Sequence, residues 1–379
     1  MNSRESPGRR IVMLLTNEYR PDPRVRKEAL ALARNNYSVK IVAWDRNHAR
    51  PTSEGIEGVW LERVRTGNVG SRLHVALNYP LFAAKAILRA RQLGYEAIHA
   101  HDFDTLPIGL LLAWLKGVPL VFDAHEQYAQ MIKTDVPGWL AGWVAWLERR
   151  LLSKVNLAIT VNGRIAERMK PYAKGTVVVI MNAVEVPEYR ARNLNREDGN
   201  LVLYYGGTLE PMRYIEETIM ATSEIDKIHV IFAGNGRLKS LVERAAVDNK
   251  KIEFHGFLPH PVMLKEMAEA DVVLCLIDPD NQNYADSLPN KVCEAMALGM
   301  PIITSKKTYA GELVARLGLG SVIHWSIGEF REAIETLRNQ TLRQSMGNKG
   351  RQMAEKDYNW AKMEQRLISA YAGLPWIRH

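Results

Sequence analysis

Short apolar runs alternate with longer amphipathic stretches along nearly the whole chain, and this alternation constrains the fold more than any other feature. Ile11–Leu15 is an apolar run of strand length, and Arg24–Arg34 carries its apolar residues near helical spacing. Repetition of this βα pattern predicts a parallel sheet with helices on both faces. The first half contains further expected strands at Val39–Trp44, Ala97–Ala100, Leu120–Phe122, Leu157–Val161 and Val177–Ile180, and further expected helices at Leu73–Leu93, Thr105–Lys116 and Trp139–Ser153.

The pattern breaks between Val184 and Asn200, in a polar and charged stretch that contains Pro187. Such a composition is typical of a linker. A second alternation follows, with strands expected at Leu201–Tyr204, Val230–Ala233, Ile252–His255, Val272–Leu276 and Pro301–Thr304, and a final amphipathic helix at Trp360–Tyr371.

A length of 379 residues suits two domains of ordinary size. We therefore predict an α/β protein of two Rossmann-like, doubly wound domains, residues 1–186 and 200–357, joined by a linker at 187–199. Ligands of doubly wound sheets bind outside the carboxyl ends of the strands. Two such halves facing each other across a cleft would bring both ligand sites into one place.

Composition and cysteine content indicate the cellular compartment in which the protein is expected. The N-terminal stretch Met1–Arg10 has no apolar segment of the kind that secretory signals carry, and Lys116 ends the strongest apolar run, Ile108–Leu115. A membrane-spanning helix needs about 20 apolar residues. Cys275 and Cys293 each lie in an apolar stretch, which is typical of reduced core thiols. The expected compartment is the cytoplasm.

Positive charge is concentrated in the first half. Residues 1–186 hold 26 Lys+Arg and 17 Asp+Glu, a net +9, and the remainder holds 24 and 25, a net −1, which together give +8. A basic half attracts phosphate groups, anionic lipid or nucleic acid, or simply keeps the surface solvated. Because no zinc-finger spacing, aromatic RNP-like strand or block of consecutive cations is present, no nucleic-acid partner is expected.

Two clusters of titratable residues directly follow expected strands of the first half. One is His99-Ala100-His101-Asp102 and the other is Asp123-Ala124-His125-Glu126. Loops at strand ends commonly carry functional residues. The alternative interpretation is a capping network in which Asp and His side chains bind loop backbone.

Glycine-rich turns follow two strands of the second half. Gly206 and Gly207 end the first of them, and Gly234-Asn235-Gly236 ends the next. Paired glycines let the backbone approach a ligand closely, although such turns alone have little specificity.

The most informative segment runs from Asp286 to Thr304. Pro289 suits the first turn of a helix, whose N-terminal N–H groups and dipole form a ready site for phosphate. Lys291 places a cation in that first turn, where the dipole disfavours one, and a bound anion would explain this placement. Glu294 lies one turn further on, either facing the same ligand or as a surface carboxylate.

Two Asp-x-Asp sequences, Asp102-Phe103-Asp104 and Asp278-Pro279-Asp280, match a metal–nucleotide pattern. Three residues have almost no specificity, and the two-half architecture favours a metal-free mechanism. No metal site is expected.

The chain resembles the family 4 glycosyltransferases of the two-domain B-type fold, from about residue 10 to its C-terminus. In Asp286–Thr304, Asp286 and Glu294 stand at the two acidic positions of the family's Glu-x7-Glu pattern, and Ala295–Pro301 matches its Ala-Met-Ala-x-Gly-x-Pro. Similar segments also occur at the two histidine clusters, the Gly-Asn-Gly turn, His255–Leu258 and Tyr358–Trp360. The last of these implies that the helix at about 358–379 packs back on the N-terminal domain.

The resemblance implies a retaining, metal-independent transfer of a hexose-type sugar from a nucleoside diphosphate donor to a hydroxyl of a glycan or lipid-linked glycan, with no cofactor beyond the donor. Glu294 would bind the ribose, Asp286 would face the transferred sugar and His125 would contact a sugar hydroxyl. The diphosphate would be held by Arg213, Lys291, the glycine turns at Gly206, Gly207, Gly234 and Asn235, and the backbone of Ser287, Leu288, Pro289, Asn290 and Lys291.

Three departures from the family pattern bear on activity. Thr208 stands where an arginine often follows the second glycine, the first acidic position is Asp286, and the loop Thr16–Pro23 lacks the usual Gly-Gly. Losing one arginine removes a charge-assisted contact of roughly 1.5–3 kcal/mol, which Lys291 could replace. Two alternatives therefore stay open, a non-catalytic subunit of a glycosyltransferase complex and a nucleotide-sugar epimerase or phosphorylase on the same fold.

A tryptophan stripe marks the helix expected at Trp139–Ser153. Trp139, Trp143, Trp146 and Arg150 share one helical face by their spacing. Such a stripe is typical of a core-facing helix, and Trp beside Arg also suits a membrane interface. Together with the basic first half, it keeps peripheral contact with the inner face of an anionic membrane open.

Overall fold

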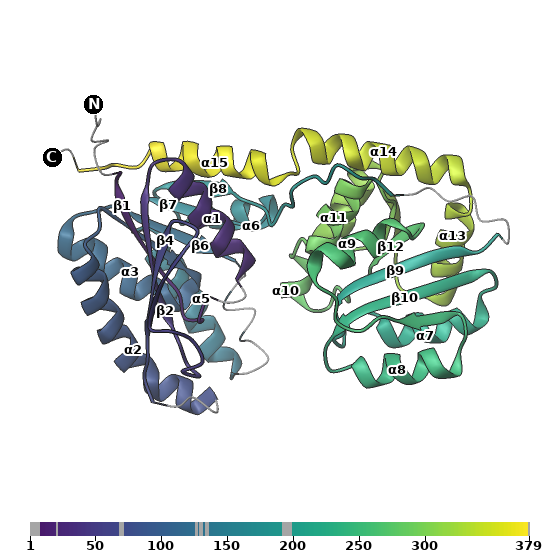
Figure 1. Cartoon of the computed structure of the whole chain (residues 1–379), viewed down its shortest axis with the longest axis horizontal. Helices are drawn as coiled ribbons and strands as arrows, with labels where there is room; N and C mark the ends of the chain where they lie inside the picture. Colours follow the sequence, from purple (N-terminus) through teal and green to yellow (C-terminus); the bar gives the residue numbers. More distant parts are fainter. Residues whose placement is uncertain are drawn as a thin grey trace. The chain divides into compact units, whose positions relative to one another are not determined.

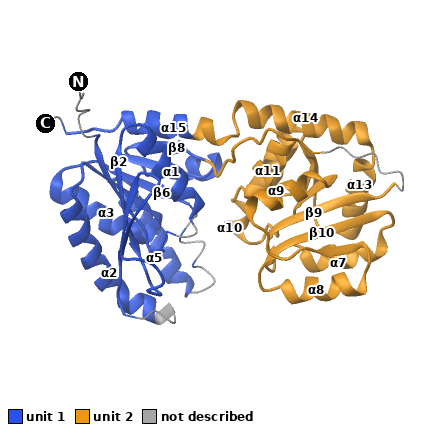
Figure 2. Ribbon diagram, in the orientation of Figure 1, with its two compact units in different colours: residues 1–180, 364–379 blue, residues 181–363 orange. Residues whose placement is uncertain are grey.

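The computed structural model describes residues 8–19, 22–67, 72–125, 128, 132, 136–191 and 199–377. The chain divides into two compact units. Unit 1 contains residues 1–180 and 364–379, and unit 2 contains residues 181–363 (Figure 2). The chain thus leaves unit 1 once and returns to it within its last helix, α15 (Trp360–Ala372). Most of the expected linker, residues 192–198, lies outside the described residues.

Unit 1 is built on an eight-stranded sheet with the order β3-β4-β2-β1-β5-β6-β7-β8 (Figure 1). All pairs are parallel except β3 with β4. The strands are β1 (Arg10–Leu14), β2 (Ser38–Trp44), β3 (Ser53–Ile56), β4 (Val59–Val64), β5 (Ala97–His101), β6 (Leu120–Ala124), β7 (Leu157–Thr160) and β8 (Thr176–Val179).

The hairpin of β3 and β4 was not among the expected strands. Glu57 and Gly58 connect the two strands, with positive φ angles of 51° and 87°. A two-residue turn with both φ values positive matches the twist of an antiparallel pair. Because β3 is short and lies at the sheet edge with partly polar residues, its sequence carries no long apolar run that would reveal a strand.

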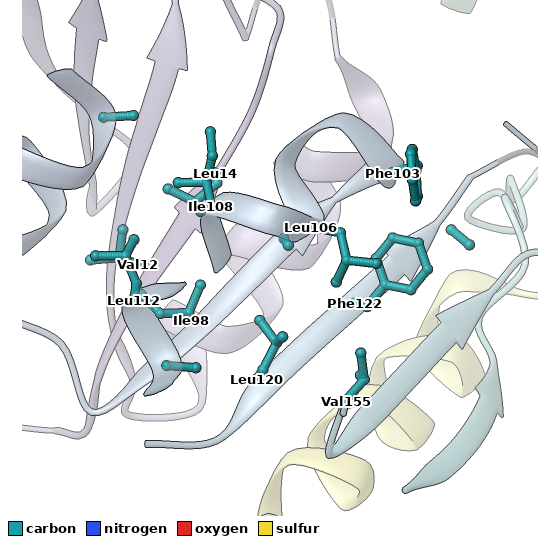
Figure 3. Packing of buried hydrophobic residues seen from close by; sticks show 14 of the residues in the cluster. Val12, Leu14, Ile98, Phe103, Leu106, Ile108, Leu112, Leu120, Phe122 and Val155 are labelled. Atoms are coloured by element: carbon teal, nitrogen blue, oxygen red, sulfur yellow. The ribbon is translucent and has the colours of Figure 1, made fainter. Parts of the chain in front are cut away.

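Helices cover both faces of this sheet. They are α1 (Pro23–Arg34), α2 (Arg72–Leu93), α3 (Asp102–Lys116), α5 (Gly138–Leu152), α6 (Gly163–Met169) and the end of α15. A single hydrophobic core joins α2, α3 and α5 to the strands. Figure 3 shows part of it, with Leu106 and Leu112 of α3 beside Val12 of β1, Ile98 of β5 and Leu120 of β6.

The tryptophan stripe of α5 does not belong to this core. Trp139, Trp143 and Trp146 expose 75%, 53% and 58% of their surface, whereas Ala141 and Val144 are buried. The interpretation of the stripe as core-facing is therefore wrong. Helical spacing alone could not decide this, because it fixes which residues share a face but not what covers that face.

Unit 2 contains a six-stranded, fully parallel sheet with the order β11-β10-β9-β12-β13-β14. Its strands are β9 (Leu201–Thr208), β10 (Ile228–Asn235), β11 (Ile252–Phe254), β12 (Val272–Cys275), β13 (Ile302–Ser305) and β14 (Gly320–Ile323). The helices are α7 (Ile215–Glu224), α8 (Lys239–Asp248), α9 (His260–Ala268), α10 (Gln282–Ala285), α11 (Asn290–Leu298), α12 (Tyr309–Leu317), α13 (Ile327–Leu337), α14 (Gln340–Lys356) and the start of α15.

Local sequence explains the boundaries of α11. Its N-cap is Pro289, in extended conformation, and its C-cap is Gly299, with φ 75° in the left-handed region that glycine favours. Every residue from Lys291 to Leu298 is buried. Helix α11 is therefore an internal helix, and only its first residue, Asn290, is exposed.

No helix in the described parts of the chain combines the length and the apolar character needed to cross a bilayer.

Candidate active site

In unit 2 the sheet reverses its winding direction beside β9. This strand pairs with β10 on one side and with β12 on the other, so the connections leave it in opposite directions. Such a switch point opens a crevice at the carboxyl ends of the strands. Gly206 and Gly207 are among the last three residues of β9, and α11 follows β12 and the short helix α10.

Two of the glycines form a close contact between neighbouring strands. Gly207 pairs with Gly234 in the register of β9 and β10, and their φ angles are 140° and 148°. A Cβ atom on Gly234 would lie 1.7 Å from the carbonyl oxygen of Gly207. The next residue, Asn235, is exposed, and its Oδ1 accepts a hydrogen bond from Gly236 N–H at 3.0 Å. Only glycine fits at position 234, because any side chain there would overlap the backbone of Gly207.

Lys291, in the first turn of α11, reaches the end of β9. Its Nζ is 3.5 Å from the centroid of the Tyr205 ring, and a Cβ on Gly207 would lie 3.5 Å from the same Nζ. Burial lowers the pKa of Lys291 to about 8. This buried ammonium is held over an aromatic face and next to a bare glycine backbone, and a bound anion would stabilise its charge.

Arg213 supplies a second cation. Its Cζ lies 4.8 Å from the centroid of the Tyr284 ring, and its Nε is buried without a hydrogen-bond partner. Burial is the main cause of the lowered pKa of Lys291, and the positive charge of Arg213 lowers it further. The two cations therefore repel each other. Two like charges kept together in a partly buried place would be stabilised by a bound anion.

The N-terminus of α11 completes the arrangement. Asp286 and Leu288 are buried just before it. Pro289 has no N–H, and the N–H of Ser287 already donates to the carbonyl of Tyr284 at 3.1 Å. The backbone N–H groups of Ser287 to Lys291 were expected to bind a diphosphate. Those of Leu288, Asn290 and Lys291 remain as the possible donors.

Glu294 lies one turn into α11 and is almost fully buried. Its Oε1 is 2.8 Å from Nε2 of His260, the first residue of α9. His260 was not among the expected site residues. Its position, directly after Pro259 at a helix start, is the only local signal in the sequence, because the partner is 34 residues away.

In unit 1 the two histidine clusters meet at the carboxyl ends of β5 and β6. His125 places Nε2 3.0 Å from Asp123 Oδ2 and Nδ1 3.3 Å from Asp102 Oδ2. Burial alone would lower the pKa of His125, but the carboxylates of Asp123 and Asp102 raise it to about 9. At neutral pH this side chain is an imidazolium and therefore a proton donor rather than a base.

Arg24 anchors this network from α1. It donates to both oxygens of Asp123, and its Nη1 donates to the carbonyl of Ile180 at 2.8 Å. Burial would raise the pKa of Asp123, but Arg24 and His125 hold it well below its usual range. The expected loop Thr16–Pro23 leads directly into this helix, although residues 20–21 are outside the described structure.

A deeper layer lies behind Asp123. Burial and the charge of Asp123 raise the pKa of Glu28 to about 8, although Arg24 lies 3.2 Å from it. His99, whose pKa burial lowers well below its usual value, shares a 2.8 Å hydrogen bond with the hydroxyl of Tyr371 in α15. Helix α15 thus packs through Tyr371 against the buried residues that lie behind Asp123 and His125.

One group among the described residues has the spacing of a metal site. Possible ligand atoms of Glu28, His99, His101 and Asp123 lie within 4.8 Å of one another. However, both oxygens of Asp123 are occupied by the guanidinium of Arg24. A fixed positive charge in this position opposes a second cation, so the group is better suited to hold protons than a metal.

The structure gathers the predicted residues into two sites. In unit 2 it brings together Gly206, Gly207, Gly234, Arg213, Lys291, Glu294 and the start of α11. His125 belongs to the cluster of unit 1, and Glu126 lies outside the described residues. Arg24, Glu28, His260 and Tyr371 are additional members, each in contact with a residue remote in sequence, which for Glu28 is His99 at 3.9 Å.

Two models of known protein families match the chain, one after the other. Residues 24–187 match the model of Glycosyltransferase Family 4, and residues 185–353 match that of Glycosyl transferases group 1. The chain is a family 4 glycosyltransferase. The two matched segments together extend over most of the chain.

Curated relatives of this family 4 glycosyltransferase are distant in sequence. An uncharacterized glycosyltransferase of Methanocaldococcus jannaschii is 23% identical over 286 residues, which cover 74% of this chain and 76% of that protein. Spore coat protein SA of Bacillus subtilis is 22% identical over 252 residues, covering 58% of this chain and 66% of that protein.

Solved structures share the complete architecture with this family 4 glycosyltransferase. Sucrose-phosphate synthase of Thermosynechococcus elongatus superimposes with a TM-score of 0.79 at 17% identity, covering 96% of this chain and 98% of that one. HepE of Anabaena, solved in complex with UDP and glucose, gives a TM-score of 0.69 at 17% identity, covering 96% and 99%. At such identities the likeness shows the fold, which is the two-domain B-type.

Proposed function

We propose that this family 4 glycosyltransferase moves a hexose-type sugar from a nucleoside diphosphate donor to a hydroxyl of a glycan or lipid-linked glycan, with retention of anomeric configuration. The observation that carries the proposal is the crevice of unit 2, where the buried Lys291 and the half-buried Arg213 lie beside the start of α11. The relative HepE, described in complex with UDP-glucose, supports a donor of this type.

The two cations supply the stabilisation that this reaction needs. Negative charge grows on the diphosphate as its bond to the sugar breaks, and preorganised donors aimed at that charge lower the barrier by several kcal/mol. Lys291, Arg213 and the N–H groups of Leu288 and Asn290 provide such donors from protein groups alone. The proposal is therefore a transfer that requires no divalent metal.

Three further roles complete the proposal. Glu294, with His260 against its carboxylate, binds the ribose hydroxyls, and Asp286 faces the transferred sugar. His125, an imidazolium held by two carboxylates, contacts a sugar hydroxyl as a donor. With a pKa of about 9, His125 is already protonated at neutral pH and cannot accept the proton of the acceptor hydroxyl. That proton goes instead to the departing phosphate.

The test is thermal stability against a panel of nucleoside diphosphates, with and without Mg²⁺, for the wild type, Glu294→Ala and Glu243→Ala. Glu243 pairs with Lys239 on the exposed surface of α8 and serves as the control carboxylate. A ligand at 100 times its Kd stabilises by about 2.7 kcal/mol. We expect a metal-independent stabilisation by one base that Glu243→Ala retains and Glu294→Ala loses.

Two outcomes would redirect the proposal. Absence of stabilisation by every nucleotide would favour a non-catalytic subunit. Binding of a nucleotide sugar that is converted to its epimer, without transfer to any acceptor, would favour an epimerase.

A further inference from the structure

Large apolar side chains gather on the outer face of three helices of unit 1. On α5, Trp139, Trp143 and Trp146 expose 75%, 53% and 58% of their surface. Their spacing of four and three residues places them on one side of the helix, opposite the buried Ala141 and Val144. The stripe ends in the exposed Arg150 on the same side.

The neighbouring helix α3 repeats this arrangement. Leu111, Trp114 and Leu115 are exposed by 41%, 78% and 48%, while Leu112 and Ala113 face the core. Helix α3 lies between α2 and α5 and packs against both. Helices α3 and α5 thus lie side by side over the same core, and each turns an apolar stripe away from it.

Helix α2 extends the same face. Leu77, Leu81 and Leu88 are exposed by 68%, 46% and 59%, on the side opposite the fully buried Phe82 and Ala86. We call the outward surface formed by these stripes of α2, α3 and α5 the Trp face. It holds nine of the 18 large hydrophobic residues that the described structure exposes, and four of the nine tryptophans of the chain. Scattered apolar residues need no explanation, whereas a contiguous set marks an interaction surface.

Positive charge surrounds the Trp face. Helix α2 contains no Asp or Glu, and its Lys85 and Arg91 are exposed, as is Arg89, which lies 3.6 Å from Glu62 of β4. Arg149 and Arg150 end α5, and Glu148 beside them is only half-exposed. The cations of α2 and α5 around the Trp face thus favour a negatively charged partner.

We infer that the Trp face docks on the surface of an anionic lipid bilayer. Tryptophan concentrates at the boundary between headgroups and acyl chains, where the ring is half in an apolar and half in a wet environment. Cations flanking such a stripe meet the phosphates of anionic lipids. A second copy of this chain on the same face would bring like charges together, which disfavours that occupant. This inference concerns only the surface of unit 1 and does not depend on the sugar or nucleotide used.

Vesicle binding by the full chain tests the inference. The probes are vesicles of phosphatidylcholine alone and vesicles with about a third phosphatidylglycerol, measured by co-sedimentation and by tryptophan fluorescence with brominated lipid as quencher. We expect binding to the anionic vesicles, with a blue shift and quenching of emission, and weaker binding as salt rises. Binding to both vesicle types alike would contradict the role given to the cations.

Matched variants identify the face. In Trp139→Ser/Trp143→Ser/Trp146→Ser we expect half-maximal binding to need at least about tenfold more lipid. Arg149→Glu/Arg150→Glu is expected to weaken binding and to reduce its dependence on salt. The control Met220→Ser/Val247→Ser removes two side chains of unit 2 that are 64% and 84% exposed, and should bind as the wild type does. Thermal unfolding checks that each variant folds.

Three results would overturn the inference. One is the absence of binding to any vesicle, and another is equal binding by the wild type and the triple tryptophan variant. The third is a wild type that is dimeric, does not bind vesicles and becomes monomeric in the triple variant, which would make this face an interface between copies. Failure of the proposed transferase activity would leave vesicle binding intact, so the two proposals are tested separately.

Discussion

The guanidinium group of Arg24 donates two hydrogen bonds to the carboxylate of Asp123, from Nε at 2.8 Å and from Nη2 at 2.7 Å. Both side chains are buried, and 99 residues separate them in the sequence. Each charge is acceptable inside the protein only because the other is present. The pair ties α1 to the end of β6 and fixes the carboxylate that holds His125.

Removal of Arg24 should destabilise unit 1 strongly. Arg24→Ala leaves the charge of Asp123 buried without its partner, and we expect a loss of about 3–5 kcal/mol in the free energy of unfolding. Arg26→Ala is the control, because Arg26 pairs with Glu57 where both side chains are half-exposed, and should cost at most about 1 kcal/mol. Urea denaturation measures both. Equal losses in the two variants would show that the buried pair has no special role.

The raised pKa of His125 should make stability depend on pH. A group whose pKa rises from 6.5 unfolded to about 9 folded stabilises the protein fully below pH 6.5 and loses that contribution as pH rises to 9. We expect the wild type to lose up to about 3 kcal/mol over this window relative to His125→Gln. Denaturation at a series of pH values measures the difference. His324→Gln, at an exposed histidine of unit 2, should keep the wild-type profile.

Lys291 should control the affinity for the donor. If its ammonium contacts the diphosphate, Lys291→Met removes a charge-assisted contact of roughly 1.5–3 kcal/mol, so the Kd should rise about 10-fold to 100-fold. Because its pKa in the free protein is about 8, the wild-type affinity should also fall between pH 7 and 9, and the variant should lack this dependence. Calorimetry at several pH values checks both, with the exposed Lys239→Met as control. An unchanged Kd in Lys291→Met would remove this residue from the site.

Gly234 should not tolerate a side chain. In Gly234→Ala the new Cβ would overlap the carbonyl oxygen of Gly207 at 1.7 Å, so the two strands must separate where the ligand is proposed to bind. Gly256→Ala is matched, because Gly256 also has positive φ but its Cβ would meet no atom within 4 Å, and it should cost about 1–2 kcal/mol. We expect a several-fold larger loss of stability in Gly234→Ala and no nucleotide binding. Similar unfolding of both variants would argue against the close strand contact.

Much of the architecture could be predicted because it follows from local patterns. Apolar runs at Ile11–Leu15 and Leu201–Tyr204 became β1 and β9, and the Pro289 and Gly299 boundaries of α11 follow from their backbone preferences. The β3–β4 hairpin escaped prediction because an edge strand buries few side chains and needs no apolar run.

Tertiary structure alone decided which side chains meet. The pairs Arg24–Asp123, Glu294–His260 and His99–Tyr371 join residues 99, 34 and 272 positions apart, and no local pattern encodes such contacts. The same holds for exposure. Sequence periodicity placed Trp139, Trp143 and Trp146 on one face of a helix, but whether that face meets the core or the solvent depends on how the helix packs on its sheet. The sequence determined the elements and their amphipathic faces, because these depend on short-range geometry, whereas the buried charge pairs and the exposed Trp face were set by long-range packing.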